Sequence, residues 1–338
     1  MSLWFKILFF FVSAKSFPPQ DMPSLKSFLL SGKAQGTTFN IKYRAADSLV
    51  TSGDVNHLFA EVDMSLSVYN PESLISKFNN GDKEIICDEY LLAVVKKSIE
   101  ICTASGGAFD ITVKPLVDLW GFGPAGKNGV PSGRKIRKAL SGVGCGQLHL
   151  EGYRLAKKNK KVQIDCNGIA QGYTVDLLSA LLESKGIKNY MVELGGEIRV
   201  LGSNEKEQDW SIGMEGPVKN IAGGYDQTRV LRLGNGAVTT SGTYRNAFSK
   251  AGKQYSHLIN PHTGYPVDNG MVSATVIAPD AFTADALDNV CMVLGPLASL
   301  KLLQQYPNVE ACLVFKSADG QLADTLTNGF KKYLIGSR

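Results

Sequence analysis

The chain has 338 residues, of which 44% are hydrophobic and 20% charged, with a formal net charge of +5. This length and composition can bury one large core or two moderate ones, which excludes disordered and fibrous proteins. The charge is mild and the lysines are scattered, so the sequence lacks the basic stripe of a nucleic-acid-binding protein, and we exclude nucleic acid as a partner.

The N-terminus has the pattern of a short export signal. Residues 1–16 read MSLWFKILFFFVSAKS, with one lysine, an apolar run and then small residues that offer two cleavage sites. A membrane-anchoring N-terminus or a first apolar strand are the alternatives, but the run is too short to span a bilayer as a helix. No cysteine follows it, which excludes a lipoprotein anchor there. We expect residues 1–16 to direct export and residues 17–338 to form one catalytic unit without a transmembrane segment.

The six cysteines show no CxxC spacing and lie mostly in apolar stretches. This pattern favours buried thiols over a zinc site or a dense disulfide framework. One disulfide is compatible with an oxidising compartment, and the sequence leaves it open.

The elements expected along the chain alternate between strands and helices. Apolar runs predict strands, and helical periodicity predicts two long helices. A Gly- and Pro-rich segment at 121–133 is expected to be a loop. The class is therefore mixed α and β. The expected strands are Thr38–Tyr43, Tyr190–Leu194, Glu197–Leu201, Val272–Ala278 and Ala311–Phe315.

The first helix is expected from about Gln171 to Lys185, with Gly186 as its C-terminal stop. The second is expected to begin near Thr283, as N-cap, and to end at Gly295. Its apolar stripe includes Leu287, Val290, Cys291 and Leu294, and its opposite face carries Asp285, Asp288 and Asn289.

The polar face of the second helix is a candidate cation site. Asp285 and Asn289 are spaced i, i+4, so their oxygens lie one turn apart on one face, as a hard cation requires. Most such faces are merely solvated. The turn Asp165–Gly172, which contains Gly168, offers backbone groups that can approach a phosphate or a cation, although a tight strand-to-helix turn is the commoner explanation.

A histidine shortly before a Pro/Gly turn is the candidate base. His257 is one of four histidines, and imidazole is the usual general base near neutral pH. A single histidine is more often structural than catalytic. Glycine turns at 194–197 and 239–242 follow strands, where they serve turn geometry or present backbone donors to a ligand.

Taken in order, these segments closely resemble the ApbE family of FAD:protein FMN transferases. The resemblance covers nearly the whole mature chain, and the ordered set is highly specific although single motifs are weak. It implies an α+β fold of mixed sheets and packed helices, the T-fold-like architecture of flavin transferases. The motifs are KAQGTTFNI at 33–41, VDMSLSVYNPESLISKFN at 62–79, GGAFDITVKPLVDLWGFG at 106–123, DCNGIAQGY at 165–173, VELGGEIRVLG at 192–202, TTSGTYRN at 239–246, SHLINPHTGYPV at 256–267 and TADALDNVCMVLG at 283–295.

The resemblance implies a role for individual residues. Magnesium would be held by the Gly168 carbonyl, Asp285 and Asn289, with His257 as the base and Asp285 essential to catalysis through the metal. This chain departs from the family at three positions. It has Gln35 where the family most often has methionine, Gln171 where it has lysine or glutamate, and Asn289 where it has threonine. The neighbouring Asp288 is an alternative source of a metal oxygen. The implied flavin contacts are Gln35, Tyr69, Ala108, Phe109, Asp110, Gln171, His257 and Ile259.

The activity implied by the resemblance is Mg2+-dependent transfer of the FMN half of FAD to a threonine or serine hydroxyl of an acceptor protein, with release of AMP. The implied partners are membrane-associated redox proteins with a flavinylation motif, and the implied location is the periplasm or the outer face of the inner membrane. Two alternatives remain: an FAD pyrophosphatase that yields FMN and AMP, and a non-catalytic FAD-binding carrier.

Overall fold

The computed structural model describes residues 24–81, 83–126, 129–219, 225–244, 247–250 and 252–335. The helices are α1 Ser52–Leu66, α2 Leu74–Asn80, α3 Glu89–Ala104, α4 Lys114–Trp120, α5 Gly133–Leu140, α6 Ala170–Ser184, α7 Ala281–Leu294 and α8 Pro296–Leu303. The strands are β1 Lys26–Ala34, β2 Thr37–Ala45, β3 Glu84–Ile86, β4 Leu148–Glu151, β5 Arg154–Lys157, β6 Tyr190–Leu194, β7 Glu197–Leu201, β8 Trp210–Lys219, β9 Tyr225–Leu233, β10 Asn235–Gly242, β11 Ala247–Lys250, β12 Lys253–Ser256, β13 Met271–Ala278, β14 Glu310–Lys316 and β15 Leu322–Leu326.

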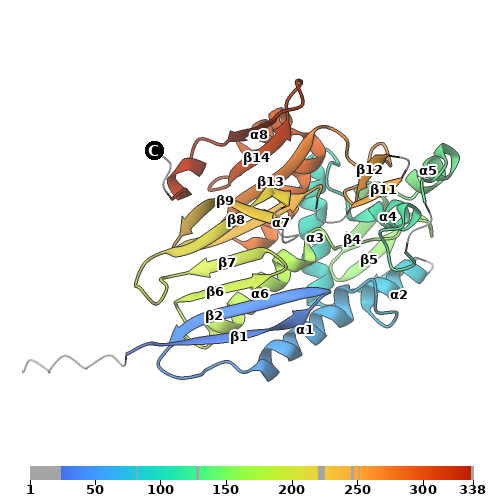
Figure 1. The fold of residues 1–338 in the computed structure, drawn as a ribbon. Coiled ribbons are helices and arrows are strands. Elements are labelled where there is room, and N and C mark those ends of the chain that lie inside the picture. The colour runs from blue at the N-terminus through green and yellow to red at the C-terminus, as the bar shows by residue number, and fades with distance from the viewer. Residues whose placement is uncertain are drawn as a thin grey trace, which may run out of the picture.

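The large sheet has eight strands in the order β1-β2-β6-β7-β10-β13-β14-β15, and every neighbouring pair is antiparallel. Figure 1 shows these strands stacked from β1 to β14. Between β2 and β6 the chain leaves the sheet and forms α1 to α6 and the three-stranded sheet β3-β5-β4. Helices pack on antiparallel sheets and no parallel βαβ pairing occurs among the described strands, so the predicted α+β class is confirmed.

Both faces of the large sheet are covered. Helices α6 and α7 pack on one face, and the hairpin β8-β9 packs on the other. Side chains alternate along a strand, so Val276 of β13 packs toward the helices and Ile277 packs under the hairpin. This two-sided cover explains why β13 is buried along nearly its whole length rather than at alternate residues.

The two helices singled out from the sequence are present. α6 begins and ends one residue earlier than expected, and Gly186 follows it with φ +76°. The expected N-cap of α7 was wrong: the helix starts at Ala281, and the Asp280 side chain accepts a hydrogen bond from Thr283 N at 2.7 Å. Both residue types are good caps, but the aspartate lies where its oxygen reaches the third amide of the helix.

The predicted export signal, residues 1–16, lies outside the described residues. Within the described part of the chain, no helix combines the length and apolar character needed to cross a bilayer.

Cys102, in the last turn of α3, forms a disulfide with Cys145, and Cys87, Cys166, Cys291 and Cys312 are buried free thiols. The sequence-based expectation of buried thiols therefore holds for these four. The disulfide closes a loop of 43 residues that contains α4 and α5.

We expect the disulfide to stabilise the fold by about 4 kcal/mol, because a loop of this length loses that much entropy in the unfolded chain. Urea denaturation of the parental protein should shift to lower urea when a thiol reductant is added. A Cys102→Ser/Cys145→Ser variant should unfold at that lower urea concentration whether or not reductant is present. Coincident parental curves with and without reductant would show that the bond contributes nothing.

Candidate active site

One cavity of about 1120 Å3 lies where α6 and α7 meet the segments that follow α1, α3 and β12. Eight separate stretches of sequence contribute to it, from the β1-β2 turn to α7. All eleven site residues implied by the family resemblance line this cavity: Gln35, Tyr69, Ala108, Phe109, Asp110, Gly168, Gln171, His257, Ile259, Asp285 and Asn289.

At one end of the cavity, oxygen atoms of three residues surround the side-chain amide of Asn289. Its Nδ2 donates to Gly168 O at 3.2 Å and to Asp288 Oδ1 at 3.0 Å, and lies 3.4 Å from Asp285 Oδ1. Rotation of the Asn289 amide by a half-turn about the Cβ–Cγ bond would exchange its nitrogen for its oxygen. The Asn289 oxygen would then face the same point as the oxygens of Gly168, Asp285 and Asp288. Carboxylate and carbonyl oxygens are the ligands that Mg2+ prefers, so this donor set suits a hard cation.

The carboxylates at this end of the cavity are buried. Asp285 is 3% exposed and Asp288 is 1% exposed, so the polar face of α7 points into the protein rather than into solvent. Gly172 N, in the first turn of α6, donates to Asp285 Oδ2 at 2.9 Å. Burial, and then the nearby Glu197 carboxylate, raise the pKa of Asp285 well above its usual range. Such a group is stabilised by a proton or by a cation.

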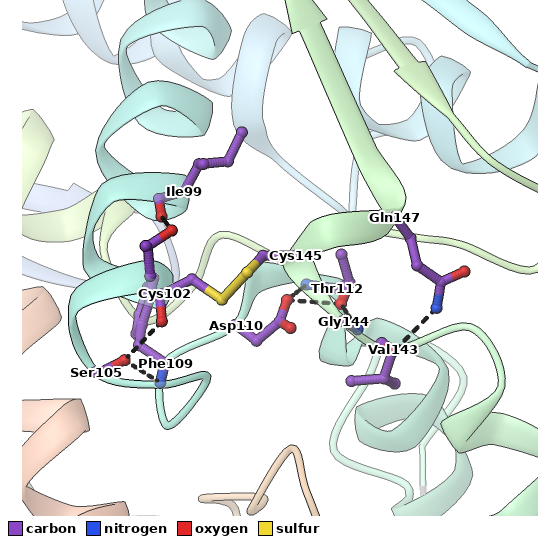
Figure 2. Close-up of a disulfide and its surroundings, with 11 residues drawn as sticks. Ile99, Cys102, Ser105, Phe109, Asp110, Thr112, Val143, Gly144, Cys145 and Gln147 are labelled. Carbon is purple, nitrogen blue, oxygen red and sulfur yellow. Dashed lines mark hydrogen bonds between the residues drawn. A yellow bond between two sulfur atoms is a disulfide. The ribbon is translucent and has the colours of Figure 1, made fainter.

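The segment after α3 forms another wall of the cavity and is fixed by local hydrogen bonds. Thr112 donates to Asp110 Oδ1 from its backbone N at 2.8 Å and from Oγ1 at 2.6 Å. Gly144 N donates to Thr112 Oγ1 at 2.7 Å, and Phe109 N donates to Ser105 Oγ at 3.2 Å. Figure 2 shows the disulfide beside this network. Burial raises the pKa of Asp110 in spite of these bonds.

Three polar residues approach the cavity from different elements. Gln35 occupies the β1-β2 turn with φ +49°, and its Nε2 donates to Thr174 Oγ1 of α6 at 3.1 Å. Gln171, in the first turn of α6, extends beside the glycine turn at Gly195. Tyr69 is 62% exposed, so its ring is available to cover a ligand. These positions fit contacts with a bound nucleotide.

His257 lies directly after β12 and also lines the cavity. Its ring makes an edge contact with Phe122, with centroids 6.4 Å apart. The following turn is held by Trp120 Nε1, which donates to Gly264 O at 2.8 Å, and Ile259 packs on Trp120. The aromatic support fixes the imidazole beside the cavity, where a general base can reach a bound substrate.

The sequence-based reasoning did not select three acidic residues that also line the cavity. Glu197 and Asp165 are buried, and Asp63 is partly buried. Burial raises the pKa of Asp63 and of Asp165. Glu197 and Asp165 lie within the glycine turns at 194–197 and 165–172. Only the backbone groups of these turns were considered from the sequence, and the acidic side chains in them were the signal that could have identified both residues.

The chain is similar in sequence and in fold to known flavin transferases. A FAD:protein FMN transferase of Vibrio cholerae is 36% identical over 315 residues, which cover 90% of this chain and 92% of that protein. The solved structure of flavin transferase ApbE from Vibrio cholerae has a TM-score of 0.83 at 34% identity, covering 92% of this chain and 100% of that one.

A crystal structure of the flavinyl transferase ApbE of Pseudomonas stutzeri, in its apo form, gives a TM-score of 0.81 at 31% identity and covers 93% of this chain and 98% of that one. The expected flavin transferase fold is thereby confirmed. Residues 35–313 match the ApbE family model, and this chain therefore belongs to the ApbE family.

Proposed function

We propose that this chain binds FAD and transfers its FMN half to a threonine or serine hydroxyl of an acceptor protein, with Mg2+ and with release of AMP. The observation that carries the proposal is the convergence of eight segments on one cavity that combines buried carboxylates with a histidine. The cavity exceeds the roughly 300–1,000 Å3 of an ordinary small-molecule pocket, so it has room for a dinucleotide and for the end of an acceptor side chain.

The residues at the α6–α7 end fit a magnesium ion. Gly168 O, the Asp285 carboxylate and the Asn289 side chain would hold it, and Asp288 supplies a further oxygen close by. When bound there, the ion would offset the charge that pyrophosphate cleavage concentrates on phosphate oxygens. Two buried carboxylates next to a backbone carbonyl are costly without such a partner.

The histidine end of the cavity supplies the base. The acceptor hydroxyl forms a new P–O bond to the FMN phosphorus while the bond from that phosphorus to the bridging oxygen breaks, and AMP leaves with that oxygen. The hydroxyl proton goes to an imidazole nitrogen of His257 and then to AMP or solvent. Gln35, Gln171, Tyr69 and the 108–110 wall would hold the dinucleotide in line with the hydroxyl.

Two alternative activities would use the same cavity. An FAD pyrophosphatase would put water in the place of the acceptor hydroxyl, and the amide of Asn289 at the metal position keeps this alternative relevant. A non-catalytic FAD carrier needs neither a base nor buried carboxylates, whereas this cavity is lined by a histidine and by buried carboxylates. The pattern of residues therefore favours a phosphoryl-transfer enzyme over a carrier.

We also propose that the chain acts after export, in the periplasm or at the outer face of the inner membrane, on membrane-associated redox proteins. The support is the signal-like pattern of residues 1–16. A disulfide between Cys102 and Cys145 is compatible with an oxidising compartment.

The function is tested by incubating the purified chain with FAD, Mg2+ and a peptide that carries one acceptor threonine. We expect FMN to become attached to the peptide, with one AMP released per FMN transferred, and a peptide with alanine at that position to stay unmodified. Mass spectrometry and chromatography measure both products. Free FMN and AMP without peptide modification would instead support a pyrophosphatase, and intact FAD would support a carrier.

A second prediction separates binding from chemistry at His257. His257→Asn keeps a polar side chain, so FAD affinity and melting temperature should remain close to parental values, while the transfer rate should fall about 10²–10⁴-fold, the usual contribution of a positioned general base. His149→Asn is the matched control, because His149 is an exposed residue of strand β4 and lies outside the cavity lining. This variant should transfer at the parental rate. A stable His257→Asn protein with full transfer activity would remove His257 from the mechanism.

A further inference from the structure

Two of the contacts between helices α6 and α7 lie one turn apart, at Gly172 and Asp176. At the first, Gly172 N donates to Asp285 Oδ2 at 2.9 Å, and a β-carbon on Gly172 would lie 2.3 Å from Ala281 O. The two helix backbones therefore touch at Gly172 with no space for a side chain. Any movement of the first turn of α7 relative to α6 changes the place of the Asp285 carboxylate.

At the second position, Asp176 binds the first two amides of α7. Its Oδ1 accepts from Ala281 N at 3.0 Å, and its Oδ2 accepts from Phe282 N at 2.9 Å. The first amides of a helix have no partner within the helix, and the Asp280 side chain accepts from the third of them, Thr283 N. Asp176 thus completes the cap from a different helix and puts a negative charge at the positive end of the α7 dipole.

Arg199 of β7 holds Asp176 in this place. Its Nη1 lies 2.7 Å from Asp176 Oδ1, and its Nη2 lies 3.8 Å from Glu183 Oε1. Burial raises the pKa of Asp176, whereas Arg199 and the two amides oppose that shift. Neither Asp176 nor Arg199 is among the residues that line the cavity. They therefore reach the site indirectly: Asp176 acts through its contacts with α7 and through charge repulsion that raises the pKa of Asp285, and Arg199 acts through Asp176.

We propose that Asp176, held by Arg199, is a positioning residue for the cation site. It fixes the first turn of α7 and so aims the Asp285 carboxylate, one turn further along, at the carbonyl of Gly168. This inference rests on the cation site of the proposed function. An ordinary helix cap would contribute to stability alone, whereas a positioning residue also sets the affinity of the site for its ion.

The test is calorimetric titration of the full chain with Mg2+ alone, in the absence of FAD. Asp176→Asn keeps the size of the side chain but loses one of its two acceptors and its charge pair with Arg199. We expect the Kd for Mg2+ to rise about 10–100-fold, the usual effect of losing a residue that orients a metal ligand. FAD affinity measured in a chelator should stay at the parental value. Asp285→Ala, which removes the ligand itself, marks complete loss of binding.

Asp88→Ala is the control for a lost helix cap, because Asp88 caps α3 by accepting from Leu91 N at 2.8 Å and lies outside the cavity lining. It should lower the melting temperature and leave the Kd for Mg2+ unchanged. Arg199→Lys is a milder variant that keeps the positive charge. It also keeps both hydrogen bonds that Asp176 accepts from the backbone amides of α7. It should give a smaller rise in Kd, and it carries the test if Asp176→Asn does not fold.

An Asp176→Asn protein with a lower melting temperature but parental Mg2+ affinity would show that Asp176 is an ordinary helix cap. That result would overturn this inference and leave the proposed function standing. If Asp176→Asn did not fold, parental Mg2+ affinity in Arg199→Lys would overturn it in the same way. A parental chain that binds no Mg2+ would instead remove the cation from the proposed function, and the inference would fall with it.

Discussion

The structure depends on the close approach of α6 and α7 over one face of the large sheet. Gly172 has no side chain, so the two backbones meet there, and the amide of Gly172 binds the buried carboxylate of Asp285. A buried carboxylate is costly unless it is paired, hydrogen-bonded or bound to a cation. The same contact that packs the helices therefore creates the charged end of the cavity and places Gly168 O beside it.

The rest of the cavity comes from segments that leave this core. The excursion between β2 and β6 brings the wall at 108–110, and the turn after β12 brings His257. The wall at 108–110 and the candidate base thus reside on different elements, each fixed by its own contacts: hydrogen bonds between Thr112 and Asp110 hold the wall, and the ring of Phe122 contacts His257. A dinucleotide bound in the cavity would contact both elements.

Much of the local structure could be predicted from the sequence, because local patterns determine it. Strands β6 and β7 were predicted with their observed bounds, and α6 was shifted by one residue. The hairpin β8-β9 and the strand order were not predicted, since they depend on pairings between distant segments. The i, i+4 pair Asp285 and Asn289 indicated a cation site, but only the fold shows that the carboxylate of Asp288 is buried beside them and that Glu197 lies near. The convergence of all eleven residues on one cavity was implied by the family resemblance and not by any spacing.

The most direct test of the account is a crystal structure of the chain with FAD and Mn2+ in place of Mg2+, with the metal located by its anomalous scattering. The account predicts a cation bound by Gly168 O and the Asp285 carboxylate, in the same cavity as the FAD pyrophosphate and with His257 facing the FMN phosphate. FAD bound in this cavity with the cation elsewhere, or FAD bound outside it, would contradict the assignment of the site.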